Sequence, residues 1–323
     1  MTRPRVLVTR RWPQAVETKM AEVFDLTLNT SDRPLTEPEL KDALGQYDAV
    51  LPTVTDRLPA AVFDRAGSRT RILANYGVGF AHIDTEAAKA SAIRVTNTPD
   101  VLSECTADIA MTLMLMVARR AGEGERELRE GRWTGWRPTH LIGTKVSGAT
   151  LGIIGFGRIG QAMAQRAHFG FGMKVLVQNR SPIAAEVLAR YNAVQVPTIE
   201  DLLPECDFVS LHCPGGAANR HLINSRRLDM MRPGAFLINT ARGEVVDELA
   251  LAQALWFGTI GGAGLDVFER EPHVPEALLG ADNLVLLPHL GSATRETREA
   301  MGFRVLENLT DFFAGREPRD LVA

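Results

Sequence analysis

Four side chains in the C-terminal half of the chain have the types that carbonyl reduction needs. Arg242, Asp266, Glu271 and His289 each stand at or just past the end of an apolar stretch that predicts a β-strand. A guanidinium can hold a carboxylate by two hydrogen bonds, and an imidazole can donate a proton near neutral pH. A carboxylate beside that ring stabilises its charged form. We therefore predict Arg242 as a carboxylate clamp, His289 as the acid/base and Glu271 as its partner; the ordinary alternatives are a surface ion pair and a satisfied histidine.

A glycine-rich segment indicates a second kind of chemistry, the binding of a dinucleotide. Residues 150–154 are a short apolar run typical of a buried strand, and a helical pattern follows the glycines. Gly155, Gly157 and Gly160 have the G-x-G-x-x-G spacing. The first permits a tight turn, the second lets the backbone approach a pyrophosphate, and the third allows close helix–strand packing. We predict that the phosphates face the N-terminus of this helix.

The residues that follow the next predicted strand, at 174–178, bear on whether the chain binds NADPH or NADH. Chains that bind NAD carry a carboxylate about 20 residues past the glycines, where it accepts hydrogen bonds from the ribose. Here Asn179, Arg180 and Ser181 stand at that place, and the next acidic residue is Glu186. Because a guanidinium pairs well with phosphate, we predict a preference for NADPH, with NADH as a second cofactor. The alternative is that Arg180 is simply solvated.

Two further segments could contact a substrate. Gly77 and Gly79 follow a predicted strand at 71–75, and such a turn would let the backbone N–H groups of Val78 and Gly79 reach a small anion; a plain turn is the alternative. Trp133 and Trp136 lie in an irregular segment. A tryptophan in a loop is usually a packing anchor, but in an oligomer it could reach a neighbour's active site.

Alternating elements predict an α/β fold. The predicted strands before residue 100 are 5–9, 48–54, 71–75 and 93–99, and the predicted helices are 13–24, 35–44 (with Thr36 and Glu39 as a capping box) and 59–66. Later strands are predicted at 150–154, 174–178, 208–214, 235–239, 261–266 and 284–289. An apolar helix at 103–120 is expected to be buried between domains or subunits, and an amphipathic helix is expected at 295–314.

Bulk properties restrict the class of protein. The 323 residues are enough for about two domains, and 45% hydrophobic with 23% charged residues is ordinary for a soluble protein. A net charge of −3 gives no reason to expect nucleic acid or an anionic membrane as partner. Three cysteines without C-x-x-C pairing and an N-terminus without a secretory signal predict a cytoplasmic protein. The apolar run at 109–118 is too short to span a bilayer, and no metal-ligand pattern is present.

Four ordered motifs give the whole chain a family resemblance. They are Gly155-Phe-Gly-Arg-Ile-Gly160, Leu237-Ile-Asn-Thr-Ala-Arg-Gly243, Gly264-Leu-Asp-Val-Phe268 through Glu271-Pro272, and Pro288-His-Leu-Gly-Ser-Ala-Thr294. With them the chain resembles the D-specific 2-hydroxyacid dehydrogenases. The resemblance implies two Rossmann-like parallel-sheet domains, one flavodoxin-like and one NAD(P)-binding, with a cleft between them. Residues 1–99 plus 290–323 would bind substrate, and residues 100–289 would bind the dinucleotide.

The resemblance also implies roles for single residues. Arg242 would bind the substrate with the N–H groups of Val78 and Gly79, His289 would be the acid/base, and Asp266 would hold the nicotinamide carboxamide. The full set of expected cofactor contacts is Thr106, Gly155, Gly157, Arg158, Ile159, Gly160, Asn179, Arg180, Ser181, Cys213, Pro214, Thr240, Asp266, His289 and Gly291. Members of the family are typically homodimers. The chain departs from the family pattern at Gly215-Gly-Ala-Ala218, where a Leu-Thr sequence is usual.

Within the family the chain looks most like the glyoxylate/hydroxypyruvate reductases. The segment Trp133-Thr-Gly-Trp-Arg-Pro138 is similar to a loop that lends a tryptophan to the partner's pocket, so Trp136 is the candidate. The expected activity is NADPH-dependent reduction of glyoxylate to glycolate and of hydroxypyruvate to D-glycerate. The alternatives are a D-3-phosphoglycerate, phosphite or formate dehydrogenase, or a dinucleotide-sensing module like the C-terminal-binding corepressors. The physiological substrate and the direction of flux do not follow from the sequence.

Overall fold

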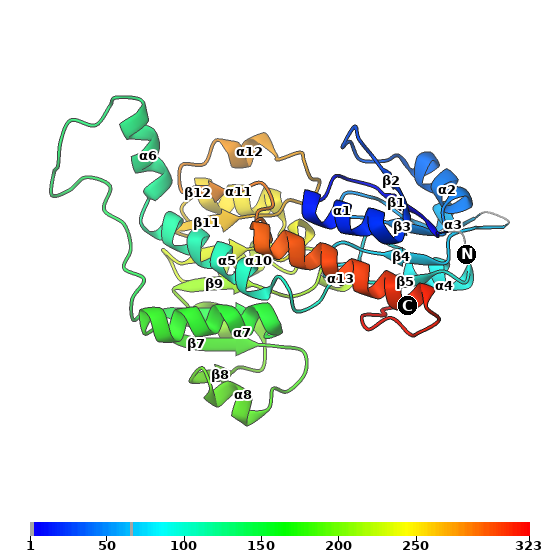
Figure 1. Ribbon diagram of the computed structural model, residues 1–323. Coiled ribbons are helices and arrows are strands. Elements are labelled where there is room, and N and C mark those ends of the chain that lie inside the picture. Colours follow the sequence, from blue (N-terminus) through cyan, green and yellow to red (C-terminus); the bar gives the residue numbers. More distant parts are fainter. Residues whose placement is uncertain (1–2, 65–66) are drawn as a thin grey trace. The chain divides into compact units, whose positions relative to one another are not determined.

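The chain divides into two compact units, each built on its own sheet (Figure 1). A computed structural model describes residues 3–64 and 67–323. Unit 1 comprises residues 1–102 and 293–323, and unit 2 comprises residues 103–292. The sequence-based boundaries at 99/100 and 289/290 lie three residues before these. Two parallel α/β units confirm the predicted fold class.

Unit 1 has a five-stranded parallel sheet in the order β2-β1-β3-β4-β5. Its strands are β1 (Arg5–Val8), β2 (Asp25–Leu28), β3 (Ala49–Leu51), β4 (Ile72–Ala74) and β5 (Arg94–Thr96). Its helices are α1 (Gln14–Val23), α2 (Glu37–Gln46), α3 (Ala60–Phe63), α4 (Thr85–Ala90) and α13 (Arg295–Phe313). The predicted helix at 59–66 is thus present as α3, and its predicted end at Arg65 and Ala66 lies outside the described residues.

Alternating side chains of β1 separate two cores in unit 1. Val6 and Val8 pack with residues of α1 and α13, whereas Leu7 packs with residues of α2, α3 and α4. This is the period of two expected for a strand that is buried on both faces. Gly302 lets α13 approach α1 closely, since a Cβ there would lie 2.5 Å from a methyl of Val16.

The last residues of the chain complete the edge of the unit 1 sheet. Val95 of β5 donates its N–H to the carbonyl of Ala323 at 2.7 Å, and Val322 donates to the carbonyl of Val95 at 2.8 Å. Asn308 of α13 hydrogen-bonds the buried carboxylate of Asp320 at 3.0 Å. Strand β5 is therefore held by a segment more than 200 residues away in sequence.

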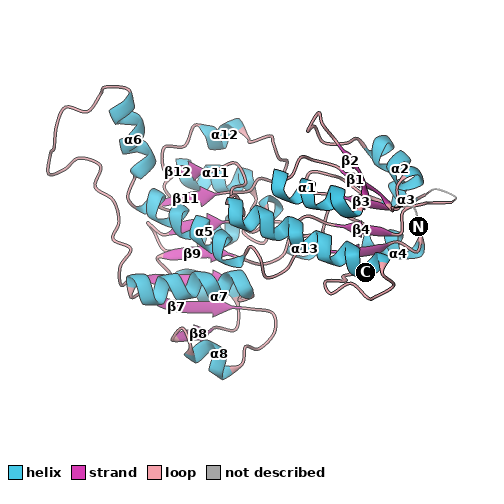
Figure 2. Ribbon diagram, viewed as in Figure 1, coloured by secondary structure: helices cyan, strands magenta, loops and turns pink. Residues whose placement is uncertain are grey.

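Unit 2 has a seven-stranded parallel sheet in the order β12-β11-β10-β9-β6-β7-β8 (Figure 2). Its strands are β6 (Thr150–Ile154), β7 (Lys174–Gln178), β8 (Ala193–Gln195), β9 (Phe208–Leu211), β10 (Phe236–Asn239), β11 (Gly262–Leu265) and β12 (Leu284–Leu286). Its helices are α5 (Ser103–Ala118), α6 (Ala121–Arg129), α7 (Arg158–Gln165), α8 (Ala185–Ala189), α9 (Ile199–Leu202), α10 (Ser225–Asp229), α11 (Glu248–Trp256) and α12 (Glu276–Leu279).

Helix α5 packs on the sheet of its own unit. It contacts β10, β11 and α7, and Leu113 and Met114 are fully buried in that core. Packing within unit 2 buries most of its apolar residues, whereas Ile109, Leu115 and Met116 are only partly buried. Burial of this helix between domains or subunits stays a prediction. No helix in the described part of the chain has the length and apolarity to cross a membrane.

Helix α6 and the segment after it project from the rest of unit 2 (Figure 1). The charged helix α6 has no buried residue. Trp133 and Trp136 follow it with 51% and 82% of their surfaces exposed. Neither tryptophan is therefore a packing anchor within this chain.

Candidate active site

The predicted catalytic side chains come together at one edge of the unit 2 sheet. Asp266 directly follows β11, Arg242 comes shortly after β10, and His289 comes shortly after β12. These three strands are neighbours and parallel, so their carboxyl ends meet at the same edge, where open α/β sheets bind ligands. Glu271 reaches the same place from the loop after β11.

His289 and Glu271 form a hydrogen-bonded pair. Nδ1 of the imidazole lies 2.8 Å from Oε2 of Glu271, and the two side chains are 29% and 31% exposed. The backbone N–H of Phe268 donates to the other carboxylate oxygen at 3.0 Å. Burial alone would raise the pKa of Glu271, but the bond and charge of His289 and this N–H lower it overall. Glu271 is thus a carboxylate at neutral pH, and the Nε2 atom of His289 is left to face a ligand.

Asp266 fixes the turn that carries His289. Its two carboxylate oxygens accept the backbone N–H groups of Leu290 at 2.6 Å and Gly291 at 2.7 Å. Thr106 of α5 donates its hydroxyl to the carbonyl of Gly291 at 3.1 Å. Burial raises the pKa of Asp266, against the effect of the N–H donors and of His289. Thr106, Asp266 and Gly291 are predicted as cofactor contacts, which stays a prediction, and the structure shows that they brace the turn that carries His289.

Arg242 is held by the chain on either side of it. Asn239 at the end of β10 donates to the carbonyl of Arg242 at 2.9 Å and accepts the N–H of Ala241 at 3.0 Å. Burial lowers the pKa of the guanidinium, and the negative charges of Glu244 and Glu271 oppose this effect. Arg242 is partly buried, and such a cation interacts more strongly with an anionic ligand than an exposed one does, because less water screens it.

Gly243 permits a close backbone contact beside this arginine. A Cβ at Gly243 would lie 1.8 Å from the carbonyl carbon of Phe268, and backbone cannot move aside as a flexible side chain can. We expect Gly243→Ala to cost about 3 kcal/mol or more of unfolding free energy, measured by denaturant titration. Gly170→Ala is the matched control, because an added Cβ there meets nothing within 4 Å. Equal stability of the two variants would contradict the contact.

The glycine-rich turn has the geometry that a pyrophosphate requires. Gly155 has φ +92°, and a Cβ there would lie 2.6 Å from the N atom of Cys213. A Cβ at Gly160 would lie 2.3 Å from the carbonyl oxygen of Gly155, whereas one at Gly157 would meet nothing within 4 Å. The turn is thus tight at its first and third glycines and open at the second. The buried Thr240 hydroxyl at the end of β10 has no partner among the described residues, so these groups fit a dinucleotide.

The end of β7 presents Arg180 to solvent. Its guanidinium makes no hydrogen bond or ion pair with the described residues, while Asn179 accepts the N–H of Phe156 at 3.3 Å and donates to the carbonyl of Ser181. Burial raises the pKa of the Cys213 thiol to about 11, and the charge of Arg180 opposes that rise. The arginine charge therefore acts on the region of Cys213, next to Gly155.

The remaining predicted cofactor contacts also lie in unit 2. Arg158 and Ile159 are in the first turn of α7, and Pro214 follows Cys213.

At Gly215-Gly216, where the sequence departs from the family pattern, the turn contacts a glutamate that the sequence interpretation missed. A Cβ at Gly215 would lie 2.3 Å from Oε1 of Glu244, and the N–H of Gly216 donates to that same oxygen at 3.1 Å. Two glycines thus make room for a carboxylate that holds the turn. In the sequence, the only signal for a role of Glu244 is its position two residues after Arg242.

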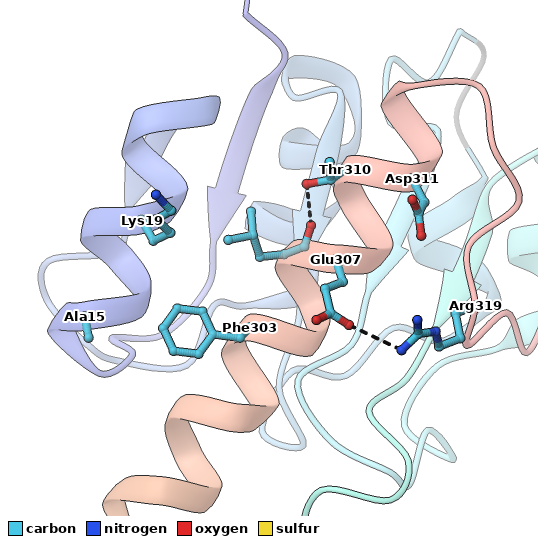
Figure 3. A pocket seen from close by; sticks show the side chains of 8 residues that line it. Ala15, Lys19, Phe303, Glu307, Thr310, Asp311 and Arg319 are labelled. Carbon is cyan, nitrogen blue, oxygen red and sulfur yellow. Dashed lines mark hydrogen bonds and ion pairs between the residues drawn. The ribbon is translucent and has the colours of Figure 1, made fainter.

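The substrate contacts predicted elsewhere lie on other parts of the chain. Val78 and Gly79 follow β4 in unit 1, and Trp136 lies in the projecting segment of unit 2. A furrow of about 700 Å³ between α1 and α13 contains none of the predicted residues (Figure 3). Its charges are paired with each other or with neighbours: Lys19 with Glu22, Glu307 with Arg319, and Asp311 with Arg316. The furrow therefore offers no unpaired charge to a ligand.

Comparisons with known proteins agree with this geometry. The family model described as the NAD-binding domain of D-isomer-specific 2-hydroxyacid dehydrogenases matches residues 111–291. The glyoxylate reductase of Thermococcus onnurineus is 43% identical over 99% of this chain and 96% of its own length. This chain belongs to the D-isomer-specific 2-hydroxyacid dehydrogenases. It is accordingly an NAD(P)-dependent oxidoreductase.

Two solved structures resemble this dehydrogenase over both of its units. A D-isomer-specific 2-hydroxyacid dehydrogenase from Polaromonas has a TM-score of 0.91 at 35% identity, with 99% of each chain covered. The NADPH-dependent glyoxylate/hydroxypyruvate reductase of Sinorhizobium meliloti, solved with NADP and malonate, has a TM-score of 0.88 at 37% identity, covering 100% of this chain and 97% of its own. Among the described residues, no cluster of three or more histidines, cysteines and acids could hold a metal ion.

Proposed function

We propose that this dehydrogenase reduces small 2-keto acids, with glyoxylate and hydroxypyruvate as first substrates and NADPH as the preferred cofactor. The observation that carries the proposal is the pair of His289 and Glu271 beside Arg242 at the end of three parallel strands. The relatives named glyoxylate reductase and the NADP complex of the Sinorhizobium enzyme support the choice of substrate and cofactor.

The proposed mechanism assigns one role to each polar group. A bound nicotinamide cofactor would supply the hydride that is added to the keto carbon. Arg242 holds the substrate carboxylate and polarises the carbonyl, and His289 delivers a proton from Nε2 to the carbonyl oxygen. Glu271 keeps the ring oriented through its hydrogen bond with Nδ1. Carbonyl plus hydride plus proton gives a 2-hydroxy acid.

We further propose how the rest of the chain contributes. Unit 1 would bind substrate through Val78 and Gly79, and unit 2 would bind the dinucleotide through the residues around Gly155. The exposed Trp136 would reach the pocket of the partner in a homodimer, which would give an apolar surface on the projecting segment a function. The reduced state of Cys105, Cys206 and Cys213 supports a cytoplasmic location.

An absorbance assay at 340 nm tests the proposal. Purified protein is supplied with glyoxylate, hydroxypyruvate or pyruvate, each with NADPH and with NADH. Fast oxidation of NADPH by the first two substrates is the expected result. Turnover with NADH alone would overturn the cofactor preference and leave the catalytic residues in place. No turnover with any combination would overturn the proposed substrate class and favour phosphite, formate or a sensor role.

Arg180→Asp tests the cofactor preference directly. We expect the ratio of kcat/KM with NADPH to that with NADH to fall by about 10- to 100-fold, because a guanidinium–phosphate contact is replaced by repulsion. Arg190→Asp, at an equally exposed arginine after α8, should leave this ratio unchanged. If both variants keep the wild-type ratio, the 2′-phosphate does not bind at Arg180.

A further inference from the structure

The turn after β4 in unit 1 has its carbonyl groups directed toward the protein interior. Asn75, which is fully buried, donates from Nδ2 to the carbonyl of Gly77 at 3.0 Å and to that of Gly79 at 3.1 Å. Asn97 donates from Nδ2 to the carbonyl of Val78 at 2.9 Å. Three successive carbonyls are thus held by two asparagine side chains.

The N–H groups of the same turn are left for a ligand. The N–H of Gly77 donates to the carbonyl of Asn75 at 3.1 Å. Those of Val78 and Gly79 make no hydrogen bond with the described residues. Consecutive amide hydrogens that point away from inward-held carbonyls form a concave site of positive partial charge, which binds anions. One carboxylate group fits such a pair.

Both polar atoms of the Asn75 side-chain amide, Nδ2 and Oδ1, have hydrogen-bond partners. Its Oδ1 lies 3.0 Å from Nε2 of His82. Since Nδ2 of Asn75 uses both hydrogens on carbonyls, Oδ1 must accept this bond and Nε2 of His82 must carry the proton. The orientation of the amide is therefore determined by its partners, and only a side chain with both donors and an acceptor satisfies them.

We propose that Asn75 is a positioning residue for the substrate. By holding the carbonyl of Gly77 inward, it orients the N–H group of Val78, which belongs to the same peptide, toward the carboxylate of a 2-keto acid. Its second bond fixes the carbonyl of Gly79 at the end of the turn, and Asn97 orients the N–H of Gly79 through the carbonyl of Val78. The N–H of Thr98 also donates to the carbonyl of Gly77 at 3.1 Å, so this carbonyl keeps one of its two donors when Asn75 is replaced. The carbonyl of Gly79 loses its side-chain donor, and the flexible glycines then let the peptides of the turn reorient. The inference rests on the proposed function, because it takes the bound anion to be the substrate carboxylate.

The kinetic test uses Asn75→Asp, which keeps the size of the side chain and removes both donors. We expect KM for glyoxylate to rise about tenfold or more, while kcat changes only a few-fold and Kd for NADPH is unchanged. Asn29→Ala is the matched control in the same unit. Asn29 also donates to two carbonyls, of Thr9 at 2.8 Å and Arg33 at 2.7 Å, far from this turn in sequence. Its loss should lower Tm without changing KM.

His82→Ala is the milder second variant if Asn75→Asp does not fold. It removes the partner of Asn75 Oδ1 and leaves the Asn75 side chain itself unchanged, so we expect a several-fold rise in KM in the same direction. A wild-type KM in every folded Asn75 or His82 variant would overturn the proposal.

A binding measurement separates this inference from the proposed function. Enzyme labelled with ¹⁵N-valine and ¹⁵N-glycine and loaded with NADPH is titrated with oxamate, an unreactive keto-acid analogue. The amide signals of Val78 and Gly79 should shift in the wild type, and at the oxamate concentration that half-saturates the wild type the shifts should be several-fold smaller in Asn75→Asp. Equal affinity of both proteins would overturn the role of Asn75 alone. Absence of these shifts in the wild type would overturn the placement of the substrate carboxylate itself.

Discussion

Arg242→Ala is expected to lower kcat/KM for glyoxylate by about 10²- to 10⁴-fold. The substitution removes two charge-assisted hydrogen bonds, each worth about 1.5–3 kcal/mol when a charged group is involved. Burial lowers the pKa of this guanidinium. The same burial limits the water that could solvate the substrate carboxylate once the guanidinium is removed. KM should rise and kcat should fall, because in the proposed mechanism the same cation binds the carboxylate and polarises the carbonyl. Steady-state kinetics with NADPH measure the effect.

Two further variants control for loss of charge and loss of fold. Arg242→Lys keeps the charge without the planar fork and should recover only part of the activity. Arg232→Ala removes an exposed arginine that is paired with Asp207 at 2.8 Å, and should keep wild-type kcat/KM. Wild-type kcat/KM in Arg242→Ala would show that the substrate carboxylate is bound elsewhere.

His289→Asn is expected to reduce kcat by about 10²- to 10⁴-fold, the usual contribution of general acid catalysis. Asparagine suits this position for two reasons. It tolerates the left-handed backbone that His289 adopts, with φ +54°, and its amide can still donate to Glu271 in place of Nδ1. What it cannot do is deliver a proton. A folded variant with wild-type kcat would exclude His289 as the proton donor.

Glu271→Gln gives an independent check on the pair. Glutamine keeps the shape of the side chain but replaces the charged partner of His289 Nδ1 by a neutral amide. Because a charge-assisted hydrogen bond is lost, we expect kcat for glyoxylate to fall by about 10- to 100-fold. A wild-type kcat with NADPH would argue against the assigned role of Glu271.

Strands buried on both faces were the elements that could be predicted best from sequence. A run such as Val6–Val8 or Leu151–Ile154 is apolar at every position, because helices cover both faces of the sheet. Strand β2 was missed for the opposite reason. As an edge strand it is half exposed, and its sequence Asp-Leu-Thr-Leu has no apolar run. The short helix α4 was missed too, although Asp84 caps it by accepting the N–H of Ala87 at 2.9 Å.

In the candidate site, residue types could be predicted but supporting contacts could not. Arg242, Glu271 and His289 stood out because their chemistry is specific and strand ends converge at one edge. Glu244 and Asn75 did not, because their importance depends on which backbone group each one meets. Asp266 was singled out for a cofactor role, and its bonds to Leu290 and Gly291 became visible only in three dimensions.

The discontinuous make-up of unit 1 has a consequence for protein synthesis. Residues 1–102 leave the ribosome first, but α13 and the segment that pairs with β5 follow only after the roughly 190 residues of unit 2. At about 5–20 residues per second, this is a wait of roughly 10–40 s. During that time the apolar surface of Val16 and Met20 lacks Met301 and Val305, which cover it in the finished protein. Nascent chains of this protein therefore expose an aggregation-prone apolar surface at that stage, and co-expression of a chaperone that binds nascent chains should raise the yield of folded protein.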